Sequence, residues 1–441
     1  MRRTHRRREP RVTDNFPEIH PALGDRAAAV EANRCLFCYD APCTNACPTH
    51  IDVPRFIKKI ATGNLRGSAQ TILSANILGL SCSRVCPVEV LCEGACVLHG
   101  YNKQPIEIGL LQRHAMDYFH THNPRIPVAA RPRPLRVACI GGGPASLSCA
   151  AELRRNGADV TIFDSRPLPG GLNTYGIAQY KLRPEDSLKE VALVRSMGVR
   201  FEEGVEIGGA KPVEELERDF DMIFVGAGLG PTHPLGIPGE DLPGVVDALR
   251  FIARYKVGLT EVGRRVVVAG AGNTAIDAAI AALRLGAEEV HLLYRRGPAE
   301  MPAFSFEYER AREEGVRFHW QTVPVAVSGS GRVERIECAR TELGAADASG
   351  RGMPRVLPGA NFSIACDMVI PAIGQSRLLE LLSACRGIEL DGGRVRVDAH
   401  TGRTSNPRYY AGGDCVNGGR EVVDAVAEGK RAALGILRAI G

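Results

Sequence analysis

Two short cysteine-rich runs constrain this sequence more strongly than any other feature. The first reaches from Cys35 to Cys47 and the second from Cys82 to Cys96, and together they hold eight of the 14 cysteines. An iron–sulfur cube needs short loops that turn several thiolates inward, together with one ligand from a distant segment. The tight spacings provide such loops, and Cys47 and Cys86 are each followed by proline, as is the cysteine that crosses to the other cluster in two-cluster ferredoxins. The runs therefore predict iron–sulfur clusters.

Two other interpretations of the cysteines are weaker. A disulfide framework is typical of small secreted domains that follow a signal peptide, and this sequence has no signal-peptide pattern. Structural zinc favours paired Cys-x-x-Cys knuckles or Cys/His sets, and here only Cys35 and Cys38 form such a pair. Histidines such as His99, His114 and His291 do not stand at metal-ligand spacing, so we expect them to be surface or packing residues.

Length and composition indicate a soluble globular protein. A chain of 441 residues is long enough for about three domains. Its 44% hydrophobic and 24% charged residues are ordinary values, and no apolar run approaches the roughly eighteen residues of a membrane-spanning helix. Much of the net charge of +5 lies in the initial stretch MRRTHRRREPR, which is typical of a disordered basic tail. We expect a cytoplasmic protein that binds neither nucleic acid nor membrane.

The region that carries the cysteine runs is predicted to be a small helical domain. The stretch IDVPRFIKKIATGNLRGSAQTIL, which lies between the two runs, has apolar residues at helical spacing. A domain this small has little core of its own, so bound clusters are expected to contribute to its folding. The following stretch NPRIPVAARPRPL is rich in proline and arginine, as linkers often are. A new domain is predicted to begin at Arg136.

The segment from Arg136 to Asp164 has the pattern of a dinucleotide-binding unit. An apolar strand leads into Gly141-x-Gly143-x-x-Ser146, a helix follows, and a second strand ends at Asp164. The first glycine permits a tight turn, the second lets the backbone approach a pyrophosphate, and the helix N-terminus faces the phosphates. Asp164 is placed to bind a ribose hydroxyl. Ser146 replaces the third glycine and is small enough for the helix to pack on the strand.

A second copy of this pattern follows in RRVVVAGAGNTAIDAAIAALRLGAEEVHLLYRRG. Its second strand ends in Tyr-Arg-Arg, where an acidic residue would be expected for NAD. Arginines suit the 2′-phosphate of NADP, so NADPH is favoured over NADH. The weaker alternative is that the two arginines are solvated surface residues. The nucleotide-binding candidates here are Gly270, Gly272, Asn273, Thr274, Ala275, Arg295 and Arg296.

A late turn completes the set of candidate cofactor contacts. Gly413 and Asp414 follow an apolar strand and precede a helix. With two dinucleotide-binding patterns upstream, such a turn suits contact with the flavin side of FAD. The six cysteines outside the two runs are scattered, and we expect them to be core residues; they are Cys139, Cys149, Cys338, Cys366, Cys385 and Cys415.

From about Ala32 to its end, the chain resembles the FAD, NAD(P) and iron–sulfur portion of dihydropyrimidine dehydrogenase, and it is more distantly similar to the small subunit of glutamate synthase. The resemblance implies an α/β fold with two Rossmann-like dinucleotide-binding domains, preceded by an all-α iron–sulfur domain. It also implies that the NAD(P) domain is inserted into the FAD domain, which resumes near PAIGQS. The segment GGLNTYGIAQYKL matches the family's stretch after the ribose acid, although Ala178 stands where proline is common, and it adds Gly171 and Leu172 as FAD-binding candidates.

The resemblance further implies two ligand sets, each for one 4Fe-4S cluster. The first set is Cys35, Cys38, Cys43 and Cys96, and the second is Cys47, Cys86, Cys92 and Gln112. Reasoning from the residues alone favours Cys82 as the eighth ligand, because thiolate is the ordinary partner of iron. The family pattern instead favours the glutamine, and Gln112 stands at the matching distance from Cys96. Glutamate synthase small subunits usually carry a glutamate at this position, and they differ between the cysteine runs, so the pyrimidine enzyme is the first expectation.

These expectations divide the chain into five parts. They are a basic tail (1–24), a helical domain with two 4Fe-4S clusters (25–130), the first part of the FAD domain (131–260), the NAD(P) domain (261–370) and the second part of the FAD domain (371–441).

The expected chemistry is hydride transfer from NAD(P)H to FAD, followed by single-electron transfer through the clusters. Such transfer needs no acid, base or nucleophile from the chain, so no catalytic residue is predicted. The expected partner is an FMN-containing catalytic subunit that reduces uracil or thymine, because this sequence contains no FMN barrel. The alternatives are an electron-transfer subunit for glutamate synthase or another acceptor, and a scaffold that has lost a cofactor. The sequence leaves the physiological direction, the stoichiometry and the cluster potentials open.

Overall fold

The computed structural model describes residues 15–122, 125–129, 131–259, 261–346 and 352–441. The first fourteen residues of the predicted basic tail lie outside the described part of the chain. The contacts divide the protein into two units. The larger unit consists of Ile19–Thr174, Lys181–Gly230 and Arg377–Gly441, and the smaller unit consists of Met1–Glu18, Tyr175–Tyr180 and Pro231–Ser376.

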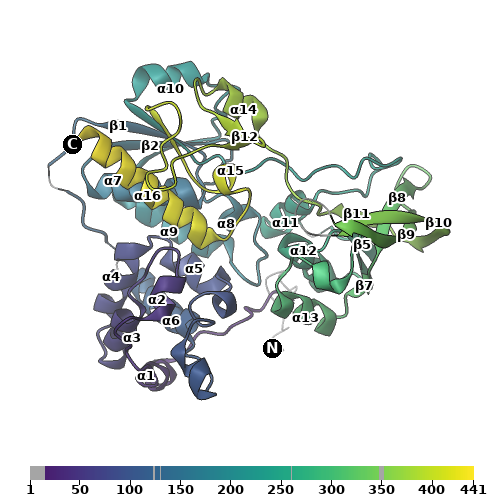
Figure 1. The fold of residues 1–441 in the computed structure, drawn as a ribbon, viewed down its shortest axis with the longest axis horizontal. Helices are drawn as coiled ribbons and strands as arrows, with labels where there is room; N and C mark the ends of the chain where they lie inside the picture. Colours follow the sequence, from purple (N-terminus) through teal and green to yellow (C-terminus); the bar gives the residue numbers. More distant parts are fainter. Residues whose placement is uncertain (1–14, 123–124, 130, 260, 347–351) are drawn as a thin grey trace, which may run out of the picture. The chain divides into compact units, whose positions relative to one another are not determined.

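The N-terminal part of the larger unit is helical and contains both cysteine runs (Figure 1). In α3 the buried residues Val53, Phe56, Ile57 and Ile60 form one stripe at helical spacing, and the Asp52 side chain caps the helix by accepting a hydrogen bond from the backbone N–H of Arg55. The helices are α1 (Asp25–Asn33), α2 (Pro42–Ala46), α3 (Val53–Ala61), α4 (Leu65–Ala75), α5 (Gly79–Val85) and α6 (Ile108–Thr121), with the 3-10 turns η2 (Val88–Val90) and η3 (Val97–Tyr101).

The rest of the larger unit is built on a parallel sheet with strand order β14-β4-β1-β2-β3. Its strands are β1 (Arg136–Ile140), β2 (Asp159–Asp164), β3 (Arg200–Glu203), β4 (Met222–Val225) and β14 (Tyr409–Ala411). The accompanying helices are α7 (Pro144–Arg155), α8 (Leu172–Tyr175), α9 (Pro184–Ser196), α10 (Val213–Asp219), α14 (Leu379–Ala384), α15 (Asp414–Asn417) and α16 (Val422–Ile440), and a short hairpin joins β12 (Leu390–Asp391) to β13 (Arg394–Val395). The Ser148 hydroxyl of α7 donates to the carbonyl oxygen of Val426 at 2.7 Å, which fixes α16 against α7.

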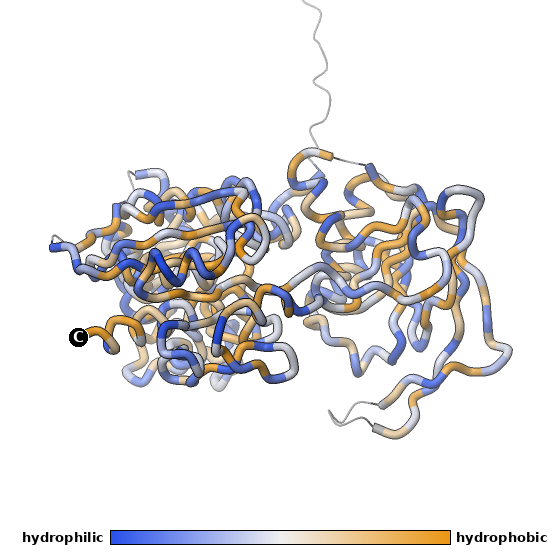
Figure 2. The backbone as a smooth tube through the Cα atoms, turned by 90° about the horizontal axis from the view of Figure 1, so that it is seen from above, coloured by the Kyte–Doolittle hydropathy of each residue, from blue (hydrophilic) through white to orange (hydrophobic). Residues whose placement is uncertain are grey.

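The smaller unit contains a second parallel sheet and an antiparallel sheet. The parallel sheet has the order β11-β5-β6-β7 and the antiparallel sheet the order β10-β9-β8. The strands are β5 (Arg265–Ala269), β6 (Glu289–Leu293), β7 (Arg317–His319), β8 (Thr322–Ser328), β9 (Arg335–Ala346), β10 (Gly352–Ala365) and β11 (Met368–Pro371). The helices are α11 (Ala248–Lys256), α12 (Asn273–Arg284) and α13 (Ser305–Glu313), with the 3-10 turn η4 (Pro298–Glu300). After their first residues, Arg265 and Glu289, the inner strands β5 and β6 are buried. Figure 2 shows hydrophobic stretches of the backbone alternating with hydrophilic ones along the chain.

The connection between strands confirms the predicted inserted topology. The larger unit's sheet is interrupted after β4 and completed by β14, which pairs with β4 in parallel register. Every strand of the smaller unit lies between these two in the sequence. The antiparallel sheet β8–β10 is an addition that the sequence analysis does not predict.

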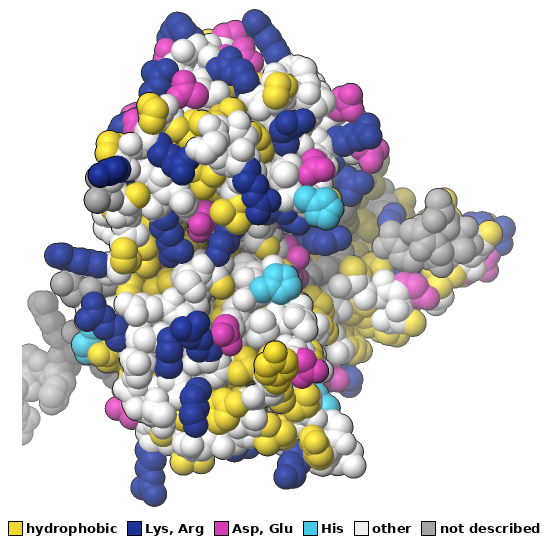
Figure 3. Space-filling view, turned by 60° about the vertical axis from the view of Figure 1, so that its left-hand side comes forward, with side chains coloured by type: hydrophobic (Ala, Val, Ile, Leu, Met, Phe, Trp, Pro, Cys, Tyr) yellow, Lys and Arg dark blue, Asp and Glu magenta, His cyan; other side chains and the backbone are white. Residues whose placement is uncertain are grey.

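One face of the molecule shows how charged side chains are distributed on it. On the face shown in Figure 3, Lys and Arg side chains are scattered among acidic and uncharged ones rather than gathered in one patch. Among the described helices, none is both long and apolar enough to cross a membrane.

Candidate cofactor and metal-binding sites

The first glycine turn joins β1 to α7 and is tightly enclosed. Gly141 has a φ of +88°, and a Cβ atom there would lie 2.7 Å from the carbonyl oxygen of Gly226. A Cβ atom at Gly142 would lie 2.4 Å from Asp164 Oδ2. Ser146 is fully buried, and its hydroxyl makes no hydrogen bond to any described residue. A backbone without room for side chains and an unpaired buried hydroxyl fit the close approach of a phosphate-bearing cofactor.

Asp164 ends β2 beside this turn, as the sequence predicts. Its Oδ2 accepts a hydrogen bond from the backbone N–H of Gly142 and its Oδ1 one from that of Arg166, both at 2.8 Å. Burial raises the pKa of Asp164, and the two hydrogen bonds oppose this shift. The carboxylate is therefore held in a fixed direction at the mouth of the turn, which suits a contact with ribose hydroxyls.

Two further predicted segments meet the first turn. Gly171 has a φ of +57°, and a Cβ atom there would lie 2.8 Å from Gly143 Cα, just before Leu172 begins α8. Gly413 has a φ of +78° and would place a Cβ atom 3.0 Å from that of Ala145. Its backbone N–H donates to Glu428 Oε2 at 2.6 Å. The larger unit therefore brings three glycine segments together, although they are far apart in sequence.

Asp414 follows this last glycine at the start of α15. Its Oδ1 accepts a hydrogen bond from the backbone N–H of Arg420 at 3.3 Å, and burial raises its pKa. Gly142, Gly226 and Glu428 are not among the residues predicted from the sequence. Gly142 stands in a run of three glycines and Gly226 in the stretch VGAGLG after β4, so both carried a local signal. Glu428, in the middle of α16, carried none.

The second glycine turn, between β5 and α12, is more open. Gly270 has a φ of +132°, and a Cβ atom there would lie 2.2 Å from the carbonyl oxygen of Ala372. At Gly272, by contrast, no atom lies within 4 Å of the position of an added Cβ. Asn273 begins α12, and its Oδ1 accepts a hydrogen bond from the backbone N–H of Phe304 at 3.2 Å. Thr274 and the buried Ala275 complete the first turn of the helix.

The two arginines after β6 have different surroundings. Arg295 is exposed. Arg296 is only 3% exposed, and its Nε donates to the carbonyl oxygen of Gly352 at 2.9 Å. The preceding Tyr294 is also buried, and its hydroxyl donates to the carbonyl oxygen of Glu300 at 2.6 Å. Of the pair, Arg295 is therefore the side chain that can meet a nucleotide from solvent.

Cys35 and Cys43 lie close to α1 and α2, and other thiols affect the pKa of both. Burial raises the pKa of Cys35, and the neighbouring thiols of Cys38 and Cys96 add to the shift. Burial likewise raises the pKa of Cys43 to about 11, again with contributions from Cys35 and Cys96. Cys96, although distant in sequence, is thus close enough to Cys35 and Cys43 to affect the pKa of both thiols.

A second group of thiols lies at the end of α5. A hydrogen bond with Cys82 raises the pKa of Cys86, and burial, Cys92 and Cys47 raise it further. Burial also raises the pKa of Cys92, to which Glu93 and Cys47 contribute. Cys47 therefore affects the pKa of both Cys86 and Cys92, Cys82 affects that of Cys86, and Cys43 of the first predicted set affects that of Cys92.

Cys82 and Gln112 both lie at this second group. The side-chain amide of Asn76 donates to Cys82 Sγ at 3.2 Å. The side-chain amide of Gln112 donates to the carbonyl oxygen of Gly79 in α5 at 2.8 Å. No three His, Cys, Asp or Glu side chains of the described residues form a group that could hold a metal ion, so the ligand sets stay predictions. The six cysteines outside the runs are all buried, as expected for core residues.

The comparisons with known proteins match both parts of the chain. Residues 12–124 match the family described as dihydropyrimidine dehydrogenase domain II, 4Fe-4S cluster, and residues 135–429 match the family described as pyridine nucleotide-disulphide oxidoreductase. The chain is 38% identical to the glutamate synthase [NADPH] small chain of Halomonas elongata, over 96% of this chain and 93% of the relative.

Two further relatives extend the comparison. The beta subunit of an NADP(+)-dependent formate dehydrogenase from Moorella thermoacetica is 37% identical over 90% of this chain and 59% of its own length. Among solved structures, FprA of Mycobacterium tuberculosis in complex with NADPH aligns with a TM-score of 0.57 at 22% identity, covering 70% of this chain and 86% of that one. This last likeness concerns the fold alone.

Proposed function

The chain belongs to the pyridine nucleotide-disulphide oxidoreductase family, and we propose that it carries electrons from NADPH through FAD and two 4Fe-4S clusters to a partner protein. The glutamate synthase small chain is among its relatives. The main support for the proposal is that an enclosed glycine turn and two groups of thiols occur in the same unit of the protein. In this assignment residues 25–130 hold the clusters, 131–260 and 371–441 hold FAD, and 261–370 bind the nucleotide.

The roles of the residues follow from their surroundings. A bound flavin would supply the conversion between hydride and single-electron transfer. Because they lack side chains, Gly141, Gly143 and Gly171 would let the backbone approach the pyrophosphate, and the Asp164 carboxylate would bind the adenosine ribose. In the smaller unit, the exposed Arg295 is assigned to the 2′-phosphate, since a guanidinium pairs well with phosphate oxygens.

The clusters are assigned to the two thiol groups. The first would be held by Cys35, Cys38, Cys43 and Cys96, and the second by Cys47, Cys86, Cys92 and either Gln112 or Cys82. The variants Q112A and C82A separate the last two. If Gln112 is the ligand, Q112A changes the electron paramagnetic resonance spectrum of one cluster and C82A leaves both spectra as in the wild type. The reverse result assigns Cys82.

Two electron acceptors are proposed, each on a specific observation. The cysteine spacing, Gln112 and the family matched by residues 12–124 favour a hetero-oligomer with an FMN-containing subunit that reduces uracil or thymine. The full-length likeness to the glutamate synthase small chain favours a glutamate synthase large subunit instead. Purified chain mixed with each candidate subunit, with NADPH oxidation followed at 340 nm, decides between them. Reduction of uracil by the lone chain would refute the need for a partner.

The first test needs no partner. We expect anaerobically purified protein to contain one FAD and about eight irons per chain, and NADPH to bleach both the flavin and the cluster absorbance more effectively than NADH. Zinc in place of iron would show that the thiol groups are structural. A flavin that neither nucleotide reduces would refute the electron-transfer function.

A further inference from the structure

Helix α5 carries Cys82 and is followed directly by Cys86, and its first turn is held by a buried carboxylate of α9. Glu190 is only 1% exposed. Its Oε1 accepts hydrogen bonds from the backbone N–H groups of Leu80 at 2.8 Å and Ser81 at 3.1 Å, and its Oε2 accepts one from the Ser81 hydroxyl. The first N–H groups of a helix have no partner within the helix, so this carboxylate satisfies buried donors that would otherwise be unpaired.

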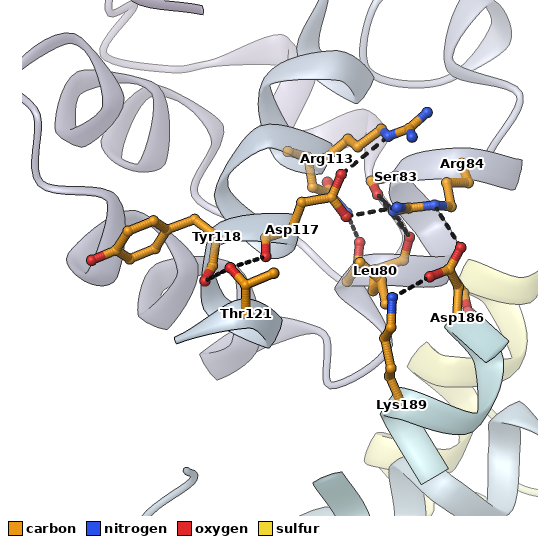
Figure 4. A network of polar contacts seen from close by, with 12 residues as sticks. Leu80, Ser83, Arg84, Arg113, Asp117, Tyr118, Thr121, Asp186 and Lys189 are labelled. Atoms are coloured by element: carbon orange, nitrogen blue, oxygen red, sulfur yellow. Dashed lines mark hydrogen bonds and ion pairs between the residues drawn. The ribbon is translucent and has the colours of Figure 1, made fainter. Parts of the chain in front are cut away.

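A second acidic side chain of α9 meets the other end of α5. Asp186 lies one helical turn before Glu190 on α9, and its Oδ2 is 3.5 Å from Arg84 Nε (Figure 4). Burial alone would raise the pKa of Asp186, but Arg84 and Lys189 hold it below its usual value. Arg84 also pairs with Asp117 of α6 at 2.6 Å. The four-residue spacing on α9 therefore matches both ends of the short helix α5.

The first turn of α5 has contacts with three other helices. Besides the bonds to Glu190, its Gly79 carbonyl oxygen accepts the hydrogen bond from Gln112, one of the two candidate ligands. A Cβ atom at Gly79 would lie 2.6 Å from Ile72 Cγ2, so the helix packs closely on α4. One peptide turn thus joins Glu190, on a helix of the flavin-binding sheet, to the residues proposed to hold the second cluster.

From this arrangement we propose that Glu190 and Asp186 are positioning residues that hold α5, and with it the second cluster, against the flavin-binding part of the larger unit. The inference rests on the proposed function for its effect on electron transfer. Loss of Glu190 would free the first turn of α5 from α9 and leave the contact between Asp186 and Arg84 at its other end. Hydride transfer from NADPH would then proceed normally, while passage of electrons from the flavin to the clusters would slow.

The test compares the variants E190A and E190Q in the full-length protein loaded with its cofactors. In stopped-flow experiments with NADPH, we expect the flavin of E190A to be reduced at the wild-type rate. The rate of cluster reduction should fall by roughly tenfold or more. Its electron paramagnetic resonance spectrum should change for one cluster and not for the other. E190Q keeps an acceptor oxygen and should restore most of the wild-type behaviour. E185Q is the matched control, because Glu185 is exposed and lies on the same helix. This variant should reduce its flavin and clusters at the wild-type rates.

Two results would overturn the proposal. Unchanged cluster reduction and unchanged spectra in E190A would show that Glu190 only fills the core. Equal loss of flavin and of both clusters would show general unfolding rather than a local release of α5.

Hydrogen exchange distinguishes failure of this inference from failure of the proposed function. In E190A the amides of Leu80 and Ser81 should exchange roughly tenfold or more faster, since their acceptor is lost, whether or not the protein transfers electrons. Unchanged exchange at these two amides would refute the role of Glu190 in holding α5, even if the protein proves to be an NADPH-fed electron carrier. Faster exchange in a protein that no nucleotide reduces would refute the proposed electron-transfer function but support the role of Glu190 in holding α5.

Discussion

The two glycine turns have the same sequence pattern but different surroundings. In the larger unit, Gly141, Gly142 and Gly171 each face an atom closer than 3 Å to the position of a Cβ. In the smaller unit, Gly270 is similarly crowded, but Gly272 faces open space. The strand after the first turn ends in a buried, hydrogen-bonded Asp164, whereas the strand after the second leads to the exposed Arg295. An enclosed turn suits a cofactor that stays bound, and an open one suits a nucleotide that must leave after each turnover.

Removal of the nucleotides should show the largest difference between the two turns. A cofactor present at a thousand times its Kd stabilises the folded protein by about 4 kcal/mol, and one at ten times its Kd by about 1.4 kcal/mol. We expect removal of FAD to lower the melting temperature strongly and addition of NADP⁺ to raise it only slightly. Calorimetry of the apo, FAD-loaded and NADP⁺-supplemented protein measures both. Equal shifts would contradict the distinction.

Matched alanine variants test the crowding itself. In G142A the new methyl group would meet the Asp164 carboxylate, so we expect a loss of about 1–3 kcal/mol in stability and a large loss of FAD. In G272A the methyl group has room, so the protein should keep its fold and FAD while its KM for NADPH rises. Flavin content, melting temperature and KM are the measurements. Retention of FAD by G142A would show that the first turn yields more easily than its contacts indicate.

The arginines after β6 sharpen the comparison at the open turn. We expect R295A to raise the KM for NADPH about 10- to 100-fold and to leave that for NADH unchanged, because a charged hydrogen bond to the 2′-phosphate is worth about 1.5–3 kcal/mol. R296A should instead lower the melting temperature, since the buried side chain donates to Gly352. If R296A alone changed the preference between nucleotides, the assignment would pass to Arg296.

The smallest effect is expected at Tyr294, which directly follows β6, whereas Asp164 is the last residue of β2. Y294F removes one hydrogen bond to Glu300 and should cost about 1 kcal/mol of stability, with no change in flavin content. Chemical denaturation followed by tryptophan fluorescence measures the loss. A release of FAD from this variant would mean that the two turns are not independent.

The features predictable from the sequence were those with a local pattern. The two glycine turns, Asp164 and the scattered core cysteines all follow from residue type and spacing, and the family resemblance led to the inserted topology that β14 and β4 confirm. The burial of Arg296 and the exposure of Arg295 were not predictable. The Gly352 carbonyl oxygen that accepts the hydrogen bond from Arg296 is distant in the sequence. Glu190 was missed for the same reason, since its partners in α5 are more than a hundred residues away.

The inserted topology also bears on how the protein is made. All strands of the smaller unit come from the continuous stretch between β4 and β14, so its sheets have every strand once β11 has left the ribosome. In the sheet of the larger unit, the edge of β4 stays unpaired until β14 is synthesised. An unpaired strand edge can form hydrogen bonds with a strand other than its native partner. Because Gly413 packs beside Ala145 only after that strand arrives, the first glycine turn is encoded early but becomes a complete binding site near the end of translation.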